Sequence, residues 1–159
     1  MNYNIRKAKQ EDAQRILELL RQIALFHRKG RPDIFSDKGP KYDLEAVKEK
    51  IADEENYVIL VAENSDGYVM GYAISQFTDF TGNQLMNDFK SLYLDDLFVD
   101  EKYRSLSIGS MLLEATKQEA KTRGCYNLDL NVWSFNEGAI RFYERHGFKE
   151  QKRRLEIIL

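Results

Sequence analysis

Residues 94–109 read LDDLFVDEKYRSLSIG and join three local patterns in one short stretch. The apolar part up to Val99 predicts a strand, the small polar residues that follow predict a loop, and the segment from Ser107 predicts a helix. The first amides of a helix have no partner inside it and the helix dipole is positive there, so small side chains let an anion approach. The stretch therefore predicts either a pyrophosphate site or an ordinary strand–turn–helix with serine caps.

The segments on either side of this stretch complete an α/β pattern. Apolar periodicity predicts helices at 11–26, 43–53, 107–123 and 136–145, and strands at 3–6, 57–62, 68–77, 91–99 and 127–133. We expect a loop at 27–41, which holds both prolines, and a closing hairpin or strand pair at 147–159. The order predicts a single α/β domain over residues 1–159 with a mixed sheet.

Composition excludes several classes of function. A formal net charge of −2, from 24 Lys+Arg and 26 Asp+Glu, predicts no general affinity for nucleic acid. A single Cys rules out an internal disulfide and a cysteine-based zinc site, and with two His we expect no metal. The sequence shows no signal-peptide pattern and no apolar run of about 18 residues, so we expect a cytoplasmic protein without a membrane partner.

A second motif follows at residues 136–148, which read NEGAIRFYERHGF and have the form N-x-x-A-x-x-F-Y-x-x-x-G-F. Together with R-x-x-S-x-G at 104–109, this motif resembles the Gcn5-related N-acetyltransferase (GNAT) family over essentially the whole chain. Residues 93–99, YLDDLFV, are similar to the Y-L-E-D-F-F-V strand of its polyamine acetyltransferase-like branch. The resemblance implies a mixed sheet with helices on both faces and a splayed parallel strand pair, ending near Val99 and Trp133, that binds CoA.

The resemblance also implies which residues hold acetyl-CoA. Strand residues would pair with the pantetheine amides, Arg104 and the loop amides would hold the pyrophosphate, and Asn136 would bond the pantetheine arm. These candidates are Leu97, Phe98, Val99, Arg104, Ser105, Leu106, Ser107, Ile108, Gly109, Ser110, Asn136 and Ala139. The chain departs from the family where Ser105 and Ser107 replace glycines, because a Cβ narrows the approach and disfavours positive φ.

For catalysis the resemblance implies a carboxylate base and a tyrosine acid. We assign the base to Asp95, acting through water, with Asp96 as the alternative, and strand alternation predicts that the two point to opposite faces. Tyr143 would protonate the leaving thiolate, and amides near Leu97 would stabilise the oxyanion. A salt-bridged strand carboxylate and a half-buried helix aromatic are the structural alternatives for Asp95 and Tyr143.

The acceptor is expected to be a small-molecule primary amine. Residues 79–100 are acidic and favour a cation, whereas loop 27–41 is basic and could contact an acidic group. The candidate substrate-binding residues are Phe26, His27, Tyr42, Asp96 and Asn131. A protein or peptide acetyltransferase, or a CoA-binding module with little turnover, stays open, as does a homodimer paired through the apolar segment 155–159.

Overall fold

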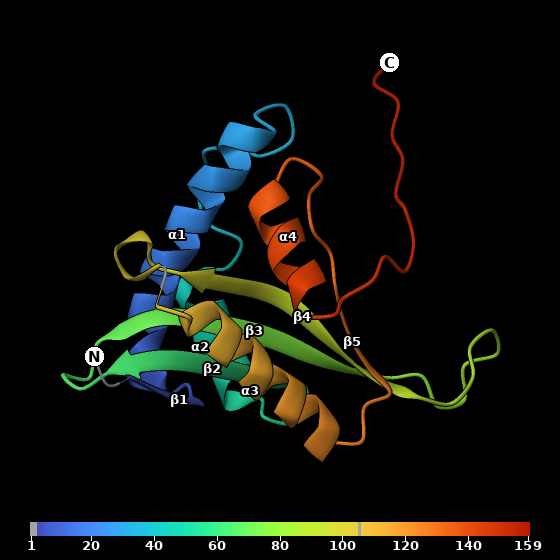
Figure 1. Cartoon of the computed structure of the whole chain (residues 1–159), viewed down its shortest axis with the longest axis horizontal. Helices are drawn as coiled ribbons and strands as arrows, with labels where there is room; N and C mark the ends of the chain where they lie inside the picture. The colour runs from blue at the N-terminus through green and yellow to red at the C-terminus, as the bar shows by residue number, and fades with distance from the viewer. Residues whose placement is uncertain (1–2, 105) are drawn as a thin grey trace.

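The computed structural model describes residues 3–104 and 106–159 (Figure 1). In chain order, the five strands are β1 (Tyr3–Lys7), β2 (Tyr57–Asn64), β3 (Val69–Asp79), β4 (Lys90–Val99) and β5 (Asn127–Leu130). The helices are α1 (Ala13–Gly30), α2 (Leu44–Ala52), α3 (Ile108–Thr122) and α4 (Glu137–Arg145), with short 3₁₀ turns at Gln10–Asp12 and Glu101–Tyr103.

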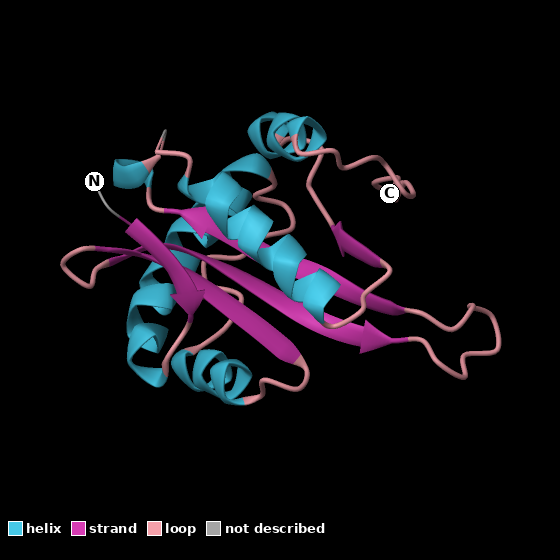
Figure 2. Ribbon diagram, turned by 60° about the horizontal axis from the view of Figure 1, so that its bottom comes forward, coloured by secondary structure: helices cyan, strands magenta, loops and turns pink. Residues whose placement is uncertain are grey.

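The strands form one mixed sheet in the order β1-β2-β3-β4-β5. The first four are antiparallel neighbours, and β5 joins β4 in parallel. Strand β5 returns parallel to β4 because α3 connects them as a crossover, which is how parallel neighbours are joined. The predicted α/β class with a mixed sheet is confirmed (Figure 2).

Helices cover both faces of the sheet, as expected (Figure 2). On one face the apolar side of α1, including Ile16, Leu19 and Leu20, packs with α2 against buried residues of β2 and β3. On the other face α3 packs its buried leucines, Leu112 and Leu113, and α4 adds partly buried aromatics. The sheet is therefore buried on both sides, and β4 carries residues into both cores.

An ion pair fixes the end of β4 to α1. Asp100 follows β4 directly, is 4% exposed, and accepts from Arg15 of α1 at 2.5 Å. The guanidinium of Arg15 also donates to the carbonyl of Val69 at the start of β3. These contacts hold the position from which the chain leaves the sheet toward α3.

Three expected boundaries are corrected. Helix α1 continues to Gly30, so part of the expected loop 27–41 is helical; basic residues in its last turn suit the helix dipole. Strand β5 ends at Leu130 instead of residue 133. The expected closing hairpin is wrong: residues 149–159 contain no Gly, Pro, Asn or Asp to form a tight turn, and they are extended, exposed and outside any strand.

Candidate active site

The pairing of the parallel strands β4 and β5 stops half-way along β4, and we call this place the split. Its register runs from Ser91 opposite Asn127 to Leu94 opposite Leu130, where β5 ends, while β4 continues to Val99. Within the described part of the chain, no strand pairs with residues 95–99 along the edge that faces β5. The splayed pair is as expected, and it leaves backbone groups of β4 open beside the chain that leads to α4 (Figure 1).

A β-bulge in β4 redirects its two carboxylates. Ile74 of β3 lies opposite Asp96 and the next residue, Ser75, lies opposite Leu94, so Asp95 is the extra residue. A bulge interrupts strand alternation and re-aims a side chain. Asp95 and Asp96 therefore both turn to the face covered by α1 and α2, and the expectation of opposite faces is wrong because it assumed an unbroken strand.

Asp95 is held by the segment between α1 and α2. The hydroxyl of Tyr42 donates to its Oδ2 at 2.5 Å, and the ammonium of Lys41 donates to its Oδ1. The Asp95 side chain is 12% exposed, and the Tyr42 ring also carries Lys50 Nζ at 4.6 Å from its centroid. Burial, with the carboxylate of Asp95, raises the pKa of Tyr42, so this hydroxyl stays a donor at neutral pH.

Asp96 has a different side-chain partner. The hydroxyl of Tyr72, a fully buried residue of β3, donates to Asp96 Oδ2 at 3.2 Å. Burial raises the pKa of Asp96 to about 7, with Asp95 adding to the rise while Lys41 opposes it. A carboxylate with that pKa takes up and releases protons at neutral pH, which is what a general base needs.

Tyr143 of α4 lies on the face of the sheet that α3 covers, opposite the face to which the two aspartates turn. Its ring packs edge-on against Phe142 and Phe148, with centroids 5.2 and 5.4 Å away. Burial raises the pKa of Tyr143, and the charge of Asp96 raises it further, so the hydroxyl stays protonated at neutral pH. Asp96 thus turns to the core under α1 and α2, whereas Tyr143 packs against the core under α3.

The predicted pyrophosphate site lies at the start of α3. Ser107, its N-cap, has φ 60° and makes no side-chain capping bond; no other non-glycine residue among 3–104 and 106–159 has positive φ. Ser105 falls outside the described residues. Arg104 folds back over the Phe98 ring, 5.4 Å from its centroid, and its Nε donates to the Val99 carbonyl at 3.3 Å.

The other cofactor candidates surround this helix start. Leu106 lies in the loop before α3, and the first turn of α3 contains Ile108, Gly109 and Ser110. Ser110 Oγ lies 3.0 Å from His146 Nε2 of α4. Asn136 caps α4 by accepting from the Ala139 amide at 3.1 Å. Its capping role is thus present in the structure, and its proposed bond to pantetheine remains a proposal.

A cluster of aromatic rings, which we call the aromatic rim, joins the end of α1 to the segment between β5 and α4. Its members are Phe26, His27, Phe35, Trp133 and Phe135. The His27 ring stacks on Phe35 at 5.2 Å, and Phe35 meets Trp133 edge-on at 5.1 Å. Burial, and then the charge of Lys41, lowers the pKa of His27, so this ring stays neutral.

Several residues predicted from the sequence lie around this site, and their roles stay predictions. Phe26, His27 and Tyr42 were predicted and lie around it, and Asn131 donates to Tyr93 Oη of β4 at 3.1 Å. Tyr72 and Lys41 were missed. Tyr72 has the sequence surroundings of any buried strand residue. Lys41 lies 54 residues before Asp95, and no local sequence pattern predicts a contact over that separation.

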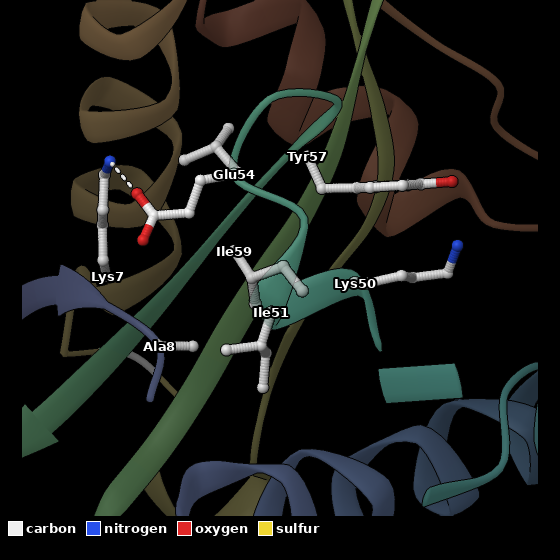
Figure 3. A pocket seen from close by; sticks show the side chains of 8 residues that line it. Lys7, Ala8, Lys50, Ile51, Glu54, Tyr57 and Ile59 are labelled. Atoms are coloured by element: carbon white, nitrogen blue, oxygen red, sulfur yellow. Dashed lines mark hydrogen bonds and ion pairs between the residues drawn. The ribbon is translucent and has the colours of Figure 1, made fainter. Parts of the chain in front are cut away.

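A separate small hollow lies away from the split, between the end of β1, the end of α2 and the start of β2 (Figure 3). An ion pair between Lys7 and Glu54 lies at one side of it, and Ile51 and Ile59 form its floor. It holds no histidine or cysteine, and we assign no chemistry to it.

Comparison with known proteins identifies the family. Residues 21–148 match the profile described as the acetyltransferase (GNAT) family. The chain belongs to the GNAT family of acetyltransferases. This acetyltransferase is 31% identical to the uncharacterized N-acetyltransferase YhfO of Bacillus subtilis, over 92% of this chain and 90% of that protein.

Two further similarities agree with that assignment. Thialysine N-ε-acetyltransferase of Bos taurus is 29% identical, over 92% of this chain and 84% of that protein. The X-ray structure of a tetramutant of the BH1408 protein from Bacillus halodurans superposes on this acetyltransferase with a TM-score of 0.92 at 29% identity, covering 98% and 99% of the two chains.

No group of three or more His, Cys, Asp or Glu side chains in residues 3–104 and 106–159 is placed to hold a metal ion. No helix in the same residues is long and apolar enough to cross a membrane.

Proposed function

We propose that this acetyltransferase moves the acetyl group of acetyl-CoA directly to a primary amine of a small cationic molecule. The observation that carries the proposal is the split between β4 and β5, where β4 continues beyond its pairing with β5 and carries Asp96, whose pKa is raised to about 7. The relatives support an amine acceptor, since one is named for thialysine and another, from Bacillus subtilis, for spermine and spermidine.

The residues of the split fit acetyl-CoA. The open edge of Leu97, Phe98 and Val99 offers backbone groups to the pantetheine amides, as an added strand would. The first intrahelical bond of α3 is made by the Met111 amide to the Ser107 carbonyl, so the amides of residues 108–110 have no partner within the helix. Together with Arg104, these amides suit a pyrophosphate. The bound thioester supplies the acetyl group.

The two pKa shifts are compatible with the acid–base roles that we propose. An alkylamine is largely protonated at neutral pH and must lose a proton before its nitrogen can attack the thioester carbonyl. Asp96 accepts that proton, directly or through water, and Tyr143 donates its hydroxyl proton to the departing thiolate sulfur. A C–N bond replaces the C–S bond. The nitrogen loses its second proton as the tetrahedral intermediate collapses; that proton restores the Tyr143 hydroxyl, directly or through water, and Asp96 releases its proton to solvent.

The sequence led us to assign the base to Asp95, with Asp96 as the alternative; we now propose the reverse. Its two oxygens already accept from Lys41 and Tyr42, whereas only Oδ2 of Asp96 accepts from a side chain in the described part of the structure. Asp95 is therefore better suited to position Lys41 and Tyr42 than to take a proton, and the structural reading of Asp95 as a salt-bridged carboxylate is compatible with its contacts.

The other functions considered from sequence have weaker support. The second candidate function is a CoA-binding module with little turnover. It is supported by Ser107 at φ 60°, because backbone strain in the loop proposed to bind phosphate would weaken the site. A protein or peptide acetyltransferase would need an open groove in place of the aromatic rim. A homodimer through residues 155–159 is proposed on the exposure of Leu155 and Ile157, 88% and 83%.

The test combines binding and turnover. Thermal unfolding is followed with and without CoA, and thiol release from acetyl-CoA is then measured across a panel of primary amines, with peptides as the comparison set. We expect a CoA-dependent rise in Tm and amine-dependent thiol release from small molecules. No rise in Tm would contradict the proposal, and a rise without thiol release for any amine would favour the binding module.

A further inference from the structure

Lys41 is a cation inside the reaction centre that the proposed mechanism does not use. Its ammonium donates to Asp95 Oδ1, and its side chain is 48% exposed while that of Asp95 is 12% exposed. An ammonium group has three N–H donors, so one contact leaves donors that a ligand from solvent can reach. Lys41 therefore presents a partly free positive charge at the entrance to the two carboxylates.

Each oxygen of Asp95 already accepts one hydrogen bond from the protein. Lys41 occupies Oδ1 and Tyr42 occupies Oδ2, and the charge of Lys41 compensates that of the carboxylate. The second ammonium of a diamine would find no bare carboxylate at Asp95 and would meet a like charge in Lys41. The ion pair of Lys41 with Asp95 therefore disfavours binding of a polyamine whose second ammonium would lie next to Asp95.

Asp96 is the remaining carboxylate, and it is the next residue in the strand, with Cα atoms about 3.8 Å apart. Two arginines of the neighbouring segment already have carboxylate partners: Arg31 pairs with Asp33 and Glu156, and Arg28 pairs with Asp37 at 3.5 Å. The centre thus presents one available acid beside one available cation, which is the complement of a zwitterion.

We propose that Lys41 determines the acceptor class, so that the site prefers a primary amine that also bears a carboxylate, as in a diamino acid, over the corresponding bare diamine. The reacting amine lies toward Asp96 and Tyr143, and the acceptor carboxylate binds the free face of the Lys41 ammonium. This inference rests on the proposed acetyl transfer to amines and narrows it to one substrate class.

The experiment compares two acceptors that differ only by the carboxylate: L-lysine and cadaverine, with L-ornithine and putrescine as a second pair. Values of kcat/KM are measured from thiol release for the wild type, Lys41→Gln and Lys41→Arg. Lys38→Gln is the matched control, because Lys38 lies in the same exposed segment and has no ion pair among the described residues. We expect the wild type to prefer each amino acid.

A charged hydrogen bond contributes enough for about a tenfold preference or more, mostly through KM. Lys41→Gln should reduce the ratio of amino acid to diamine to about one, Lys41→Arg should restore most of it, and Lys38→Gln should leave it unchanged. Equal or better use of the diamines by the wild type overturns the proposal. A ratio that survives Lys41→Gln, or amines accepted only outside both pairs, also overturns it. Failure of every amine contradicts the proposed function instead.

Discussion

The hydroxyl of Tyr72 donates to Oδ2 of Asp96 across 3.2 Å, from the strand beside it. Tyr72 is fully buried, so this bond joins the carboxylate to the rigid centre of the sheet. The bond favours the charged form of Asp96, as does Lys41, yet burial outweighs both and the pKa is raised to about 7. The bulge at Asp95 makes this contact possible, because it turns Asp96 to the same face as Tyr72.

Replacing each carboxylate by its amide separates the two aspartates. We expect Asp96→Asn to lower kcat about 100-fold or more, because it removes the proton acceptor but keeps the shape. Asp95→Asn should change kcat by about tenfold or less and act mainly on KM, since Asp95 holds Lys41 and Tyr42. Steady-state kinetics measure both, with Tm confirming that each variant is folded. A larger loss of kcat in Asp95→Asn than in Asp96→Asn would indicate that Asp95 is the base.

Removing one hydroxyl tests the proposed acid. Tyr143→Phe keeps the ring that packs against Phe142 and Phe148, so the CoA-induced rise in Tm should persist while kcat falls about 100-fold. Tyr126→Phe is the matched control, because Tyr126 is 82% exposed and outside the site. Unchanged turnover in Tyr143→Phe would exclude this hydroxyl as the acid.

Backbone strain at the start of α3 predicts a stabilising substitution. Ser107 adopts φ 60°, which costs a residue with a Cβ about 1 kcal/mol, and its side chain makes no capping bond that would offset the cost. Ser107→Gly should therefore raise the free energy of unfolding by about 1 kcal/mol, and Ser107→Ala should leave it nearly unchanged. Denaturant unfolding measures both. Equal effects of the two substitutions would show that φ is not the cause.

The ion pair between Arg15 and Asp100 predicts an acid-sensitive stability. Burial alone would raise the pKa of Asp100, but the Lys102 amide and the Arg15 guanidinium lower it below the ordinary value. Because the folded pKa is the lower one, the pair contributes fully above the unfolded pKa of about 3.9, and the contribution is lost as pH falls through the folded pKa.

The variant Asp100→Asn isolates this contribution. It should lower the free energy of unfolding by about 3 kcal/mol at pH 7, because it leaves Arg15 without its buried partner. The difference from wild type should shrink below pH 4. Unfolding curves between pH 3 and pH 7 measure it, and a difference that stays constant over that range would contradict the assignment.

Much of the architecture could be predicted because it depends on local periodicity and caps. The apolar spacing of α1 and α3, and Asn136 before α4, mark elements that the structure contains. The bulge could not be predicted, since residues 93–97 look like a regular strand and the extra residue is defined only by pairing with β3. The contact of Lys41 with Asp95 joins segments 54 residues apart and has no local signature.

The pH dependence of kcat/KM for an accepted amine, in the wild type and in Asp96→Asn, tests the central claim most directly. The wild-type activity should rise with pH through an apparent pKa of about 7, because Asp96 must be ionised to accept the proton. In Asp96→Asn this step should disappear, leaving a much lower rate that increases only with the free-amine fraction. A variant that keeps both the wild-type rate and the step near pH 7 would contradict the account.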